Sequence, residues 1–229
     1  MALVEIRDVH KSFQRDTQRI EVFTGLTLDI DDGSFTAVMG PSGSGKSTLL
    51  NLIAGLDKPT SGTVQVAGAV VSAMAPGELA RWRSRHVGFV FQSFNLLPVL
   101  TAYQNVELPL LLTSLTKKER DERVRIALGV VGLEDRMHHY PRQLSGGQEQ
   151  RTAIARAIVA DPTLTMLDEP TGQLDAKSSQ EVLALLQRLN TEFKKTIIIV
   201  THDAHAAERA TTTLHLEKGD LVEKGVVAR

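Results

Sequence analysis

The most informative segment of this chain reads Gly40-Pro41-Ser42-Gly43-Ser44-Gly45-Lys46-Ser47-Thr48. It fits the phosphate-loop spacing G-x-x-x-x-G-K-[ST] through Gly40, Gly45, Lys46 and Ser47. A strand-like run at 35–39 precedes it, and residues 48–55, apolar at helical spacing and closed by a glycine, follow it. This order of strand, glycine loop and helix predicts a phosphate-binding loop rather than a flexible glycine turn with an incidental lysine.

The residue types of the loop suit a polyphosphate. Glycines let successive backbone N–H groups turn inward on phosphate oxygens, and the helix N-terminus adds a partial positive charge. We expect Lys46 to reach the β- and γ-phosphates and the Ser47 hydroxyl to coordinate Mg²⁺. The sequence therefore predicts that the chain binds a nucleoside triphosphate.

Composition excludes several classes of protein. The 229 residues are 42% hydrophobic and 23% charged, which is ordinary for a globular protein of one large domain or two small lobes. A formal net charge of −1 gives no basic field for nucleic acid, and the absence of cysteine excludes disulfides and thiolate metal sites. No apolar run approaches the roughly 20 residues of a membrane helix, and no signal peptide opens the chain. We expect a soluble, cytoplasmic protein.

Strand-like and helical runs alternate along most of the chain. Early strands are predicted at 3–9, 20–23 and 25–30, and later ones at 87–91, 164–167 and 196–200. This pattern predicts an α/β fold with a mainly parallel sheet, an antiparallel patch near the N-terminus and a helical insertion in the middle.

The helical insertion carries its own start and stop signals. Thr116 with Glu119 three residues later predicts a capping box, and Gly132 is expected to end the charged helix 119–131. The side chains that we expect to face inward from this helix are Val124, Ile126, Leu128 and Val131.

Two adjacent carboxylates, Asp168 and Glu169, follow a predicted buried strand. In a doubly wound sheet the strand ends are where ligands bind, and successive side chains point in different directions there. Asp168 can hold Mg²⁺ beside Ser47, while Glu169 can polarise the water that attacks the γ-phosphorus. The alternative is a solvated acidic turn.

A second candidate anion site reads Leu144-Ser145-Gly146-Gly147-Gln148 and precedes an alanine-rich helix. Backbone N–H groups at such a helix start suit an anion, although a plain helix cap would explain the segment alone. A phosphate loop, then Leu-Ser-Gly-Gly-Gln, then Leu-Asp-Glu-Pro-Thr, in this order, resembles the ATP-binding-cassette (ABC) ATPases. The resemblance covers about residues 3–222.

The resemblance implies a fold and an assembly. It implies one nucleotide-binding domain over 1–229, with a P-loop (RecA-like) core and antiparallel β subdomain at 1–91 and 152–229 and a helical subdomain at 92–151. It also implies that two cassettes pack head to tail. Each ATP is then enclosed by the phosphate loop of one copy and by Ser145, Gly146, Gly147 and Gln148 of the other.

Single positions match the family's remaining functional residues. Phe13 stands where an aromatic ring stacks on adenine, although a core residue at a strand end is the alternative. Gln92 matches the glutamine that reaches Mg²⁺ and the attacking water, and His202 the histidine that senses the γ-phosphate. Asp175 matches the loop that contacts the opposite subunit. The implied catalytic set is Glu169, His202, Gln92 and Lys46, and the implied Mg²⁺ set is Ser47, Gln92 and Asp168.

Residues 91–110 and 168–175 resemble the branch that serves lipoprotein release and macrolide or antimicrobial-peptide export in bacteria. This implies an ATPase coupled to transport, a separate membrane permease as partner, and a place on the cytoplasmic face of the inner membrane. Cassettes of DNA repair, chromosome organisation or translation are the alternative. The first two carry a long coiled coil, and the interval 92–144 is short and lacks heptads; translation factors carry two cassettes. Intact Glu169 and His202 disfavour a regulator without turnover.

The apolar segment 94–98, Phe94-Asn95-Leu96-Leu97-Pro98, comes shortly after Gln92. Contiguous apolar groups on a loop are typical of a partner site, so we expect this segment to dock the membrane subunit. The alternative is that its side chains anchor the helical lobe to the core.

Overall fold

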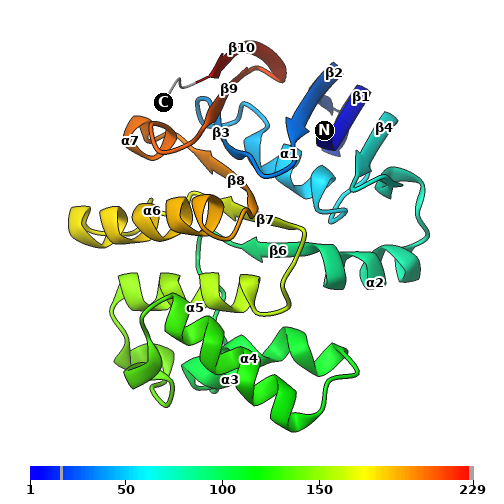
Figure 1. Cartoon of the computed structure of the whole chain (residues 1–229). Helices are drawn as coiled ribbons and strands as arrows, with labels where there is room; N and C mark the ends of the chain where they lie inside the picture. The colour runs from blue at the N-terminus through cyan, green and yellow to red at the C-terminus, as the bar shows by residue number, and fades with distance from the viewer. Residues whose placement is uncertain (16–17, 227–229) are drawn as a thin grey trace.

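The computed structural model describes residues 1–15 and 18–226, and within them the strands form two sheets (Figure 1). The larger sheet has the order β10-β9-β3-β8-β7-β6, and every neighbouring pair except β10 and β9 is parallel. Its strands are β3 (Phe35–Met39), β6 (Val87–Val90), β7 (Leu164–Asp168), β8 (Thr196–Thr201), β9 (Thr212–Glu217) and β10 (Asp220–Val226). The predicted mainly parallel sheet is confirmed.

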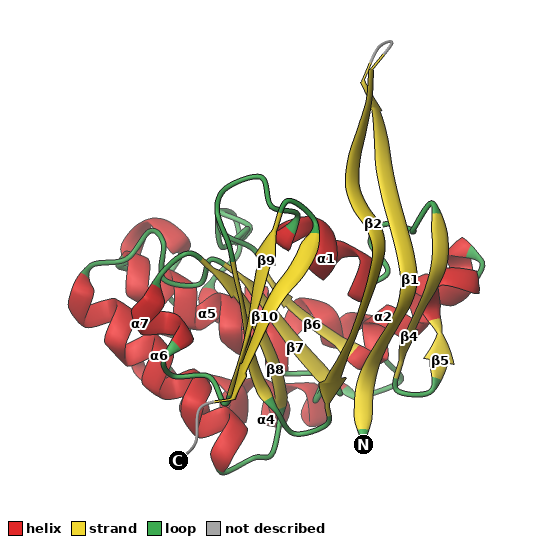
Figure 2. Cartoon of the chain, turned by 90° about the horizontal axis from the view of Figure 1, so that it is seen from above, coloured by secondary structure: helices red, strands yellow, loops and turns green. Residues whose placement is uncertain are grey.

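The smaller sheet is the predicted antiparallel patch, with the order β2-β1-β4-β5. Its strands are β1 (Ala2–Arg15), β2 (Gln18–Asp31), β4 (Ser61–Val66) and β5 (Ala69–Val70). The runs 20–23 and 25–30, expected as separate strands, lie in the single strand β2. Figure 2 shows the β1–β2 hairpin extending well beyond the body of the molecule.

Some of the helices pack on the larger sheet, and others lie further from it (Figure 1). The helices are α1 (Lys46–Ile53), α2 (Pro76–His86), α3 (Ala102–Glu107), α4 (Lys117–Val130), α5 (Gly146–Ile158), α6 (Ala176–Thr191) and α7 (Ala204–Ala207). Short 3₁₀ turns are η1 (Val71–Ala73), η2 (Leu108–Leu112), η3 (Glu134–Arg136) and η4 (Pro141–Gln143). In Figure 1, α5 lies between the larger sheet and the pair α3 and α4. Among the described residues, no helix is long and apolar enough to cross a membrane.

The larger sheet is buried on both faces. Ile197 and Ile199 of β8 belong to the core shared with α4, α5 and α6, while Ile198 and Val200 belong to the core shared with α1 and the smaller sheet. Because successive side chains of a strand point to opposite faces, a strand covered on both sides has a continuous apolar run. This burial explains why the run 197–200 lacks polar residues.

The start and end of α4 agree with the sequence. The Glu119 N–H donates to Thr116 Oγ1 at 3.3 Å, and the Thr116 N–H donates to Glu119 Oε2 at 2.7 Å, so the predicted capping box is confirmed. Gly132 has a φ of 67°, and its N–H donates to the Gly129 carbonyl at 3.0 Å. Gly132 therefore follows the end of the helix in the left-handed conformation that glycine favours.

The buried face of α4 differs from the prediction at one position. Val124, Leu128 and Val131 are buried, but Ile126 is 60% exposed. A helical residue two positions from Val124 and from Leu128 points away from both, since neighbours on one face are three or four apart. Ala127 lies on the buried face instead.

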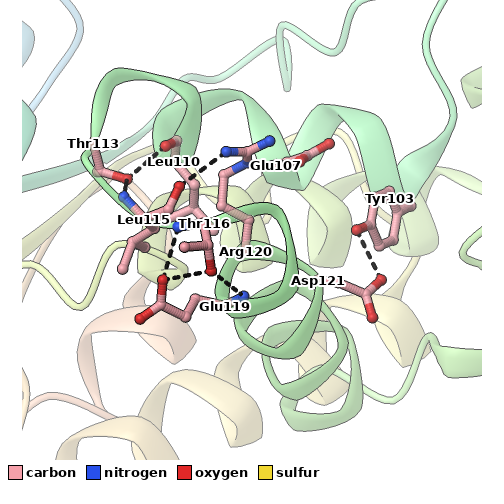
Figure 3. A network of polar contacts seen from close by, with 9 residues as sticks. All are labelled: Tyr103, Glu107, Leu110, Thr113, Leu115, Thr116, Glu119, Arg120 and Asp121. Atoms are coloured by element: carbon pink, nitrogen blue, oxygen red, sulfur yellow. Dashed lines mark hydrogen bonds and ion pairs between the residues drawn. The ribbon is translucent and has the colours of Figure 1, made fainter.

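A network of polar contacts joins α3 to α4 (Figure 3). The Tyr103 hydroxyl donates to Asp121 Oδ1 at 2.9 Å, and Arg120 Nε donates to Glu107 Oε1 at 3.0 Å and its Nη1 to the Leu115 carbonyl at 3.0 Å. Burial and the Asp121 carboxylate raise the pKa of Tyr103 to about 12, so its hydroxyl keeps its proton at neutral pH. These contacts stabilise the two helices as one unit.

Candidate active site

The glycine loop between β3 and α1 packs under the β1–β2 hairpin. Gly45, at the N-cap of α1, has a φ of 100°, and a Cβ there would lie 2.9 Å from the Phe23 ring and 3.0 Å from Val22 Cγ1. Only glycine fits that backbone conformation and that close approach. Lys46 is 8% exposed, and its Nζ donates to the Gly40 and Pro41 carbonyls at 2.8 and 2.9 Å. The loop thus holds a buried ammonium against its own backbone.

A pocket of about 590 Å³ lies beside this loop. Segments far apart in the sequence meet there, because the carboxyl ends of parallel strands share one edge of the sheet. The lining residues are Val22, Ser42, Gly43, Gly45, Lys46, Ser47, Thr48, Gln92, Asp168, Glu169 and His202. The structure thus brings together the loop, Gln92, both carboxylates and His202. It does not place Phe13 or Ser145, Gly146, Gly147, Gln148 and Asp175 on this lining.

The two carboxylates have different surroundings. Asp168 ends β7, and burial raises its pKa, while a hydrogen bond from Ser47 acts in the opposite direction. Glu169 has a φ of 48°, and its N–H donates to the Val200 carbonyl at 2.9 Å. Positive φ in a residue other than glycine is strained and clusters at functional sites. Glu169 Oε1 lies 2.9 Å from His202 Nδ1, with the glutamate side chain 13% exposed and the histidine 69%.

A protein-family model described as "ABC transporter" matches residues 23–172. The chain belongs to the ABC transporter family. It is an ATP-binding subunit of a transporter, and its reaction is ATP hydrolysis, as the sequence predicted.

Three similar proteins illustrate the relationship. YknY of Bacillus subtilis, an uncharacterised ABC transporter ATP-binding protein, is 47% identical over 220 residues, covering 96% of this chain and 95% of YknY. The macrolide export ATP-binding/permease protein MacB of Escherichia coli K12 is 45% identical over 220 residues, which are 96% of this chain but 34% of MacB. The post-hydrolysis dimer of the ATP-binding cassette MJ0796, bound to ADP and Pi, is 40% identical with a TM-score of 0.91, covering 99% of both chains.

These matches confirm the predicted fold class of the cassette and favour transport over the DNA-repair, chromosome and translation alternatives.

The segment 144–148 starts helix α5 of the cassette. Ser145 Oγ accepts the Gln148 N–H at 3.3 Å, and Gln148 Oε1 accepts the Ser145 N–H at 2.9 Å, which is a capping box. A Cβ on Gly147 would lie 2.7 Å from Ser178 Oγ and 2.9 Å from Ser178 Cβ. Asp175 caps α6 by accepting the Ser178 N–H at 3.0 Å. The first turn of α5 therefore contacts the first turn of α6. The sequence predicts that both of these helix starts act across a dimer.

The cassette also holds a contact that the sequence did not reveal. After Gln92 the chain passes through Phe94 and Asn95, with φ values of 57° and 50°. Arg156 of α5 donates to both carbonyls, from Nη1 to Asn95 at 2.6 Å and from Nη2 to Phe94 at 2.7 Å. An arginine in an alanine-rich helix was the available signal. Its partners lie 61 and 62 residues away, so no local pattern identifies them.

The side chains of the segment 94–98 differ in burial. Phe94 and Leu96 are partly buried and pack against the core, as an anchor would. Leu97 is 46% exposed, and Val99 just beyond the segment is 77% exposed. The anchoring alternative therefore holds for two side chains, while Leu97 remains available to a partner.

Proposed function

We propose that this cassette powers a bacterial export or release system of the macrolide-export and lipoprotein-release type. The observation that supports it most is the pocket that unites Lys46, Asp168, Glu169 and His202. The likeness to MacB over 96% of this chain supports the branch. In this proposal two copies close head to tail around two ATP molecules on the cytoplasmic face of the inner membrane and drive a separate permease. The division into a helical subdomain at 92–151 and a core at 1–91 and 152–229 stays a prediction.

The phosphate loop suits the triphosphate of ATP. Lys46 Nζ is held by two backbone carbonyls, which are neutral acceptors that a charged phosphate oxygen can outcompete. Residues Gly40 to Thr48 form the loop from which backbone N–H groups bind phosphate oxygens.

The polar groups beside the loop fit Mg²⁺. Ser47 is hydrogen-bonded to Asp168, and Gln92 lines the same pocket. Hydroxyl, carboxylate and amide oxygens are hard ligands, and Mg²⁺ at a nucleotide site takes few ligands from protein because phosphates supply others. Held by these residues, the ion would neutralise negative charge on the triphosphate.

The Glu169–His202 pair suits hydrolysis. Glu169 is the carboxylate that orients and polarises the attacking water, because it is the less exposed of the two and sits one residue beyond the Mg²⁺ ligand. His202 is largely exposed and faces Glu169 through Nδ1, and its other ring nitrogen has no hydrogen bond to the residues that the structure describes. When it carries a proton, that nitrogen can donate to the γ-phosphate. Loss of the pair's geometry would therefore lower turnover more than ATP binding.

Two segments outside the pocket are assigned to the second copy's ATP. Ser145 accepts a backbone N–H in its own helix cap, yet a hydroxyl keeps its own proton to donate to a phosphate. Gly146 is exposed in the first turn of α5, where backbone N–H groups can meet an anion, while Gly147 is buried and lets that turn pack closely on Ser178. Asp175, at the adjoining helix start, contacts the opposite copy. The MJ0796 dimer of similar fold supports this arrangement.

A groove beside the segment 94–98 suits the permease. It has a volume of about 500 Å³ and a mostly apolar lining that includes Leu56, Phe91, Leu108, Leu112 and Arg156. Leu112 and Leu56 are 79% and 45% exposed, and large apolar side chains exposed along one groove are typical of a partner site. Arg156 links this groove to the backbone just after Gln92.

Replacing Glu169 with glutamine tests the assignment of the site. Glu169→Gln keeps the shape but removes the charge that orients water, so ATP turnover should fall by roughly 10²–10⁴. The variant should still bind ATP and elute as a dimer with ATP and Mg²⁺, whereas the exposed control Glu192→Gln should behave as the parent. Normal turnover by Glu169→Gln would contradict the proposal.

The branch needs a separate experiment. Tagged cassette should be purified from detergent-solubilised membranes of its own host. An integral membrane protein with a large extracytoplasmic domain is expected to co-purify in stoichiometric amount. Recovery of the cassette with DNA, ribosomes or no membrane protein would contradict the transport assignment.

A further inference from the structure

Lys11 is a buried lysine of strand β1, where it pairs with Phe23 of β2. Its side chain is 9% exposed, and Nζ donates to the Lys58 carbonyl at 2.8 Å and lies 2.7 Å from Asp57 Oδ2. The same Nζ stands 4.6 Å from the centroid of the Phe13 ring. A lysine ammonium within about 6 Å of a ring centroid is attracted to the ring face. Lys11 thus joins the ring of Phe13 to the loop that follows α1.

Phe13 lies on the same hairpin as the residues that contact the phosphate loop. Lys11 pairs with Phe23, and Phe13 pairs with Ile20, with a register shift between them that leaves Val22 as the extra residue of β2. Such a bulge turns neighbouring side chains to one face. Both Val22 and Phe23 contact the position of Gly45, and Val22 lines the pocket. Phe13 and Ile20 continue this face outward along the hairpin, where they are 42% and 44% exposed.

The ammonium occupies one side of this exposed ring. An exposed phenylalanine samples rotamers within nanoseconds, and its ordering on ligand binding costs free energy. Contact with a buried, ion-paired lysine restricts that motion before the ligand arrives. Phe13 remains 42% exposed with the lysine in place, and flat nucleobases stack on exposed aromatic rings.

We propose that Lys11 is a positioning residue of the base subsite, holding Phe13 from one side so that the nucleobase stacks on the other. This rests on the proposed role of Phe13 in nucleotide binding. The Asp57 N–H donates to the Asn51 carbonyl of α1 at 3.1 Å, so the lysine's partner is tied to the helix that the phosphate loop begins. Through this chain of contacts, Lys11 fixes the base subsite relative to the phosphate subsite.

The test compares two ligands that share phosphates. The whole chain is titrated by calorimetry in EDTA, which prevents turnover, with ATP and with inorganic tripolyphosphate, which lacks the base. Lys11→Met keeps length and apolar character but removes the ammonium. It should weaken ATP binding by about threefold to tenfold and leave tripolyphosphate binding unchanged. Lys58→Met, which removes a neighbouring ammonium that donates to the Met74 carbonyl, should change neither.

A double-mutant cycle separates this inference from the proposed function. Phe13→Leu should weaken ATP selectively, and Lys11→Met should then cause no further loss, because the lysine acts through the ring. If Phe13→Leu leaves ATP affinity unchanged, the base subsite itself is misplaced. If Phe13→Leu weakens ATP binding, three results for Lys11→Met would show that the positioning role is wrong. ATP binding could be unchanged, or the binding of ATP and tripolyphosphate could weaken equally. The third is that Lys11→Met causes its full loss of ATP affinity even in the Phe13→Leu background. Should Lys11→Met fail to fold, Lys11→Arg keeps a cation at the ring and must retain ATP affinity above that of a folded Lys11→Gln.

Discussion

Replacing Gly147 with alanine is expected to destabilise the cassette even without ATP, although this glycine lies in the segment assigned to the second copy's nucleotide. The added Cβ would lie 2.7 Å from Ser178 Oγ and 2.9 Å from Ser178 Cβ. Rotation of the serine hydroxyl relieves the first contact only, because Cβ is fixed by the backbone of α6. The start of α5 must therefore move away from α6.

The magnitude follows from two opposing effects. Overpacking of this kind costs about 1–3 kcal/mol, and displacing Ser178 also disturbs its bonds to Asp175, where a lost helix cap costs about 0.5–2 kcal/mol. Alanine is the better helix former by at most about 1 kcal/mol, and less in a first turn. The net loss is about 1–3 kcal/mol. For a chain of this length each kcal/mol shifts Tm by about 2–4 °C, so Tm should fall by roughly 2–12 °C.

The neighbouring glycine provides a matched control. A Cβ on Gly146 would lie 3.6 Å from Leu174 Cδ2, an ordinary contact, so Gly146→Ala should leave Tm unchanged or slightly raised. Thermal unfolding followed by circular dichroism without nucleotide measures both variants. Ser178→Gly removes both crowded atoms, so combining it with Gly147→Ala should cost less than the sum of the single changes. Equal Tm values for Gly146→Ala and Gly147→Ala would refute the packing argument.

Three other changes test separate parts of the molecule. Ser145→Arg should abolish turnover while leaving ATP affinity of the monomer nearly unchanged, and mixing it with Lys46→Ala protein should restore part of the activity; no recovery in a covalently linked mixed dimer would contradict action across the interface. Leu97→Glu should leave Tm and the isolated ATPase intact but remove membrane association, and a large drop in Tm would instead assign Leu97 to the core. Arg120→Met breaks a largely buried ion pair and should lower the free energy of unfolding by about 1–3 kcal/mol. Arg125→Met breaks an exposed pair and should lower it by less than about 1 kcal/mol. Chemical denaturation measures both variants, and similar losses would contradict this difference.

The sequence by itself determined the features that depend on near neighbours. The phosphate loop could be predicted because its residues are close together in the sequence, between one strand and one helix. The capping box of Thr116 and Glu119 could be predicted because the two residues are three positions apart. The order of the three motifs was enough to indicate the family. The same local rules misplaced Ile126, whose apolar character suggested burial while its position on the helix put it in solvent.

The tertiary structure decided which distant groups meet. The clash that forbids a Cβ at Gly147 comes from Ser178, and the two hydrogen bonds that hold Phe94 and Asn95 come from Arg156. Lysine side chains are usually exposed, but the fold buries Lys11 beside the ring of Phe13. Such contacts depend on how sheets and helices pack. The pattern of apolar residues along the chain predicts helices and strands, but it does not identify which distant residue a side chain will contact. Local hydrogen bonding therefore fixes the elements, and packing between elements fixes the roles of the residues on them.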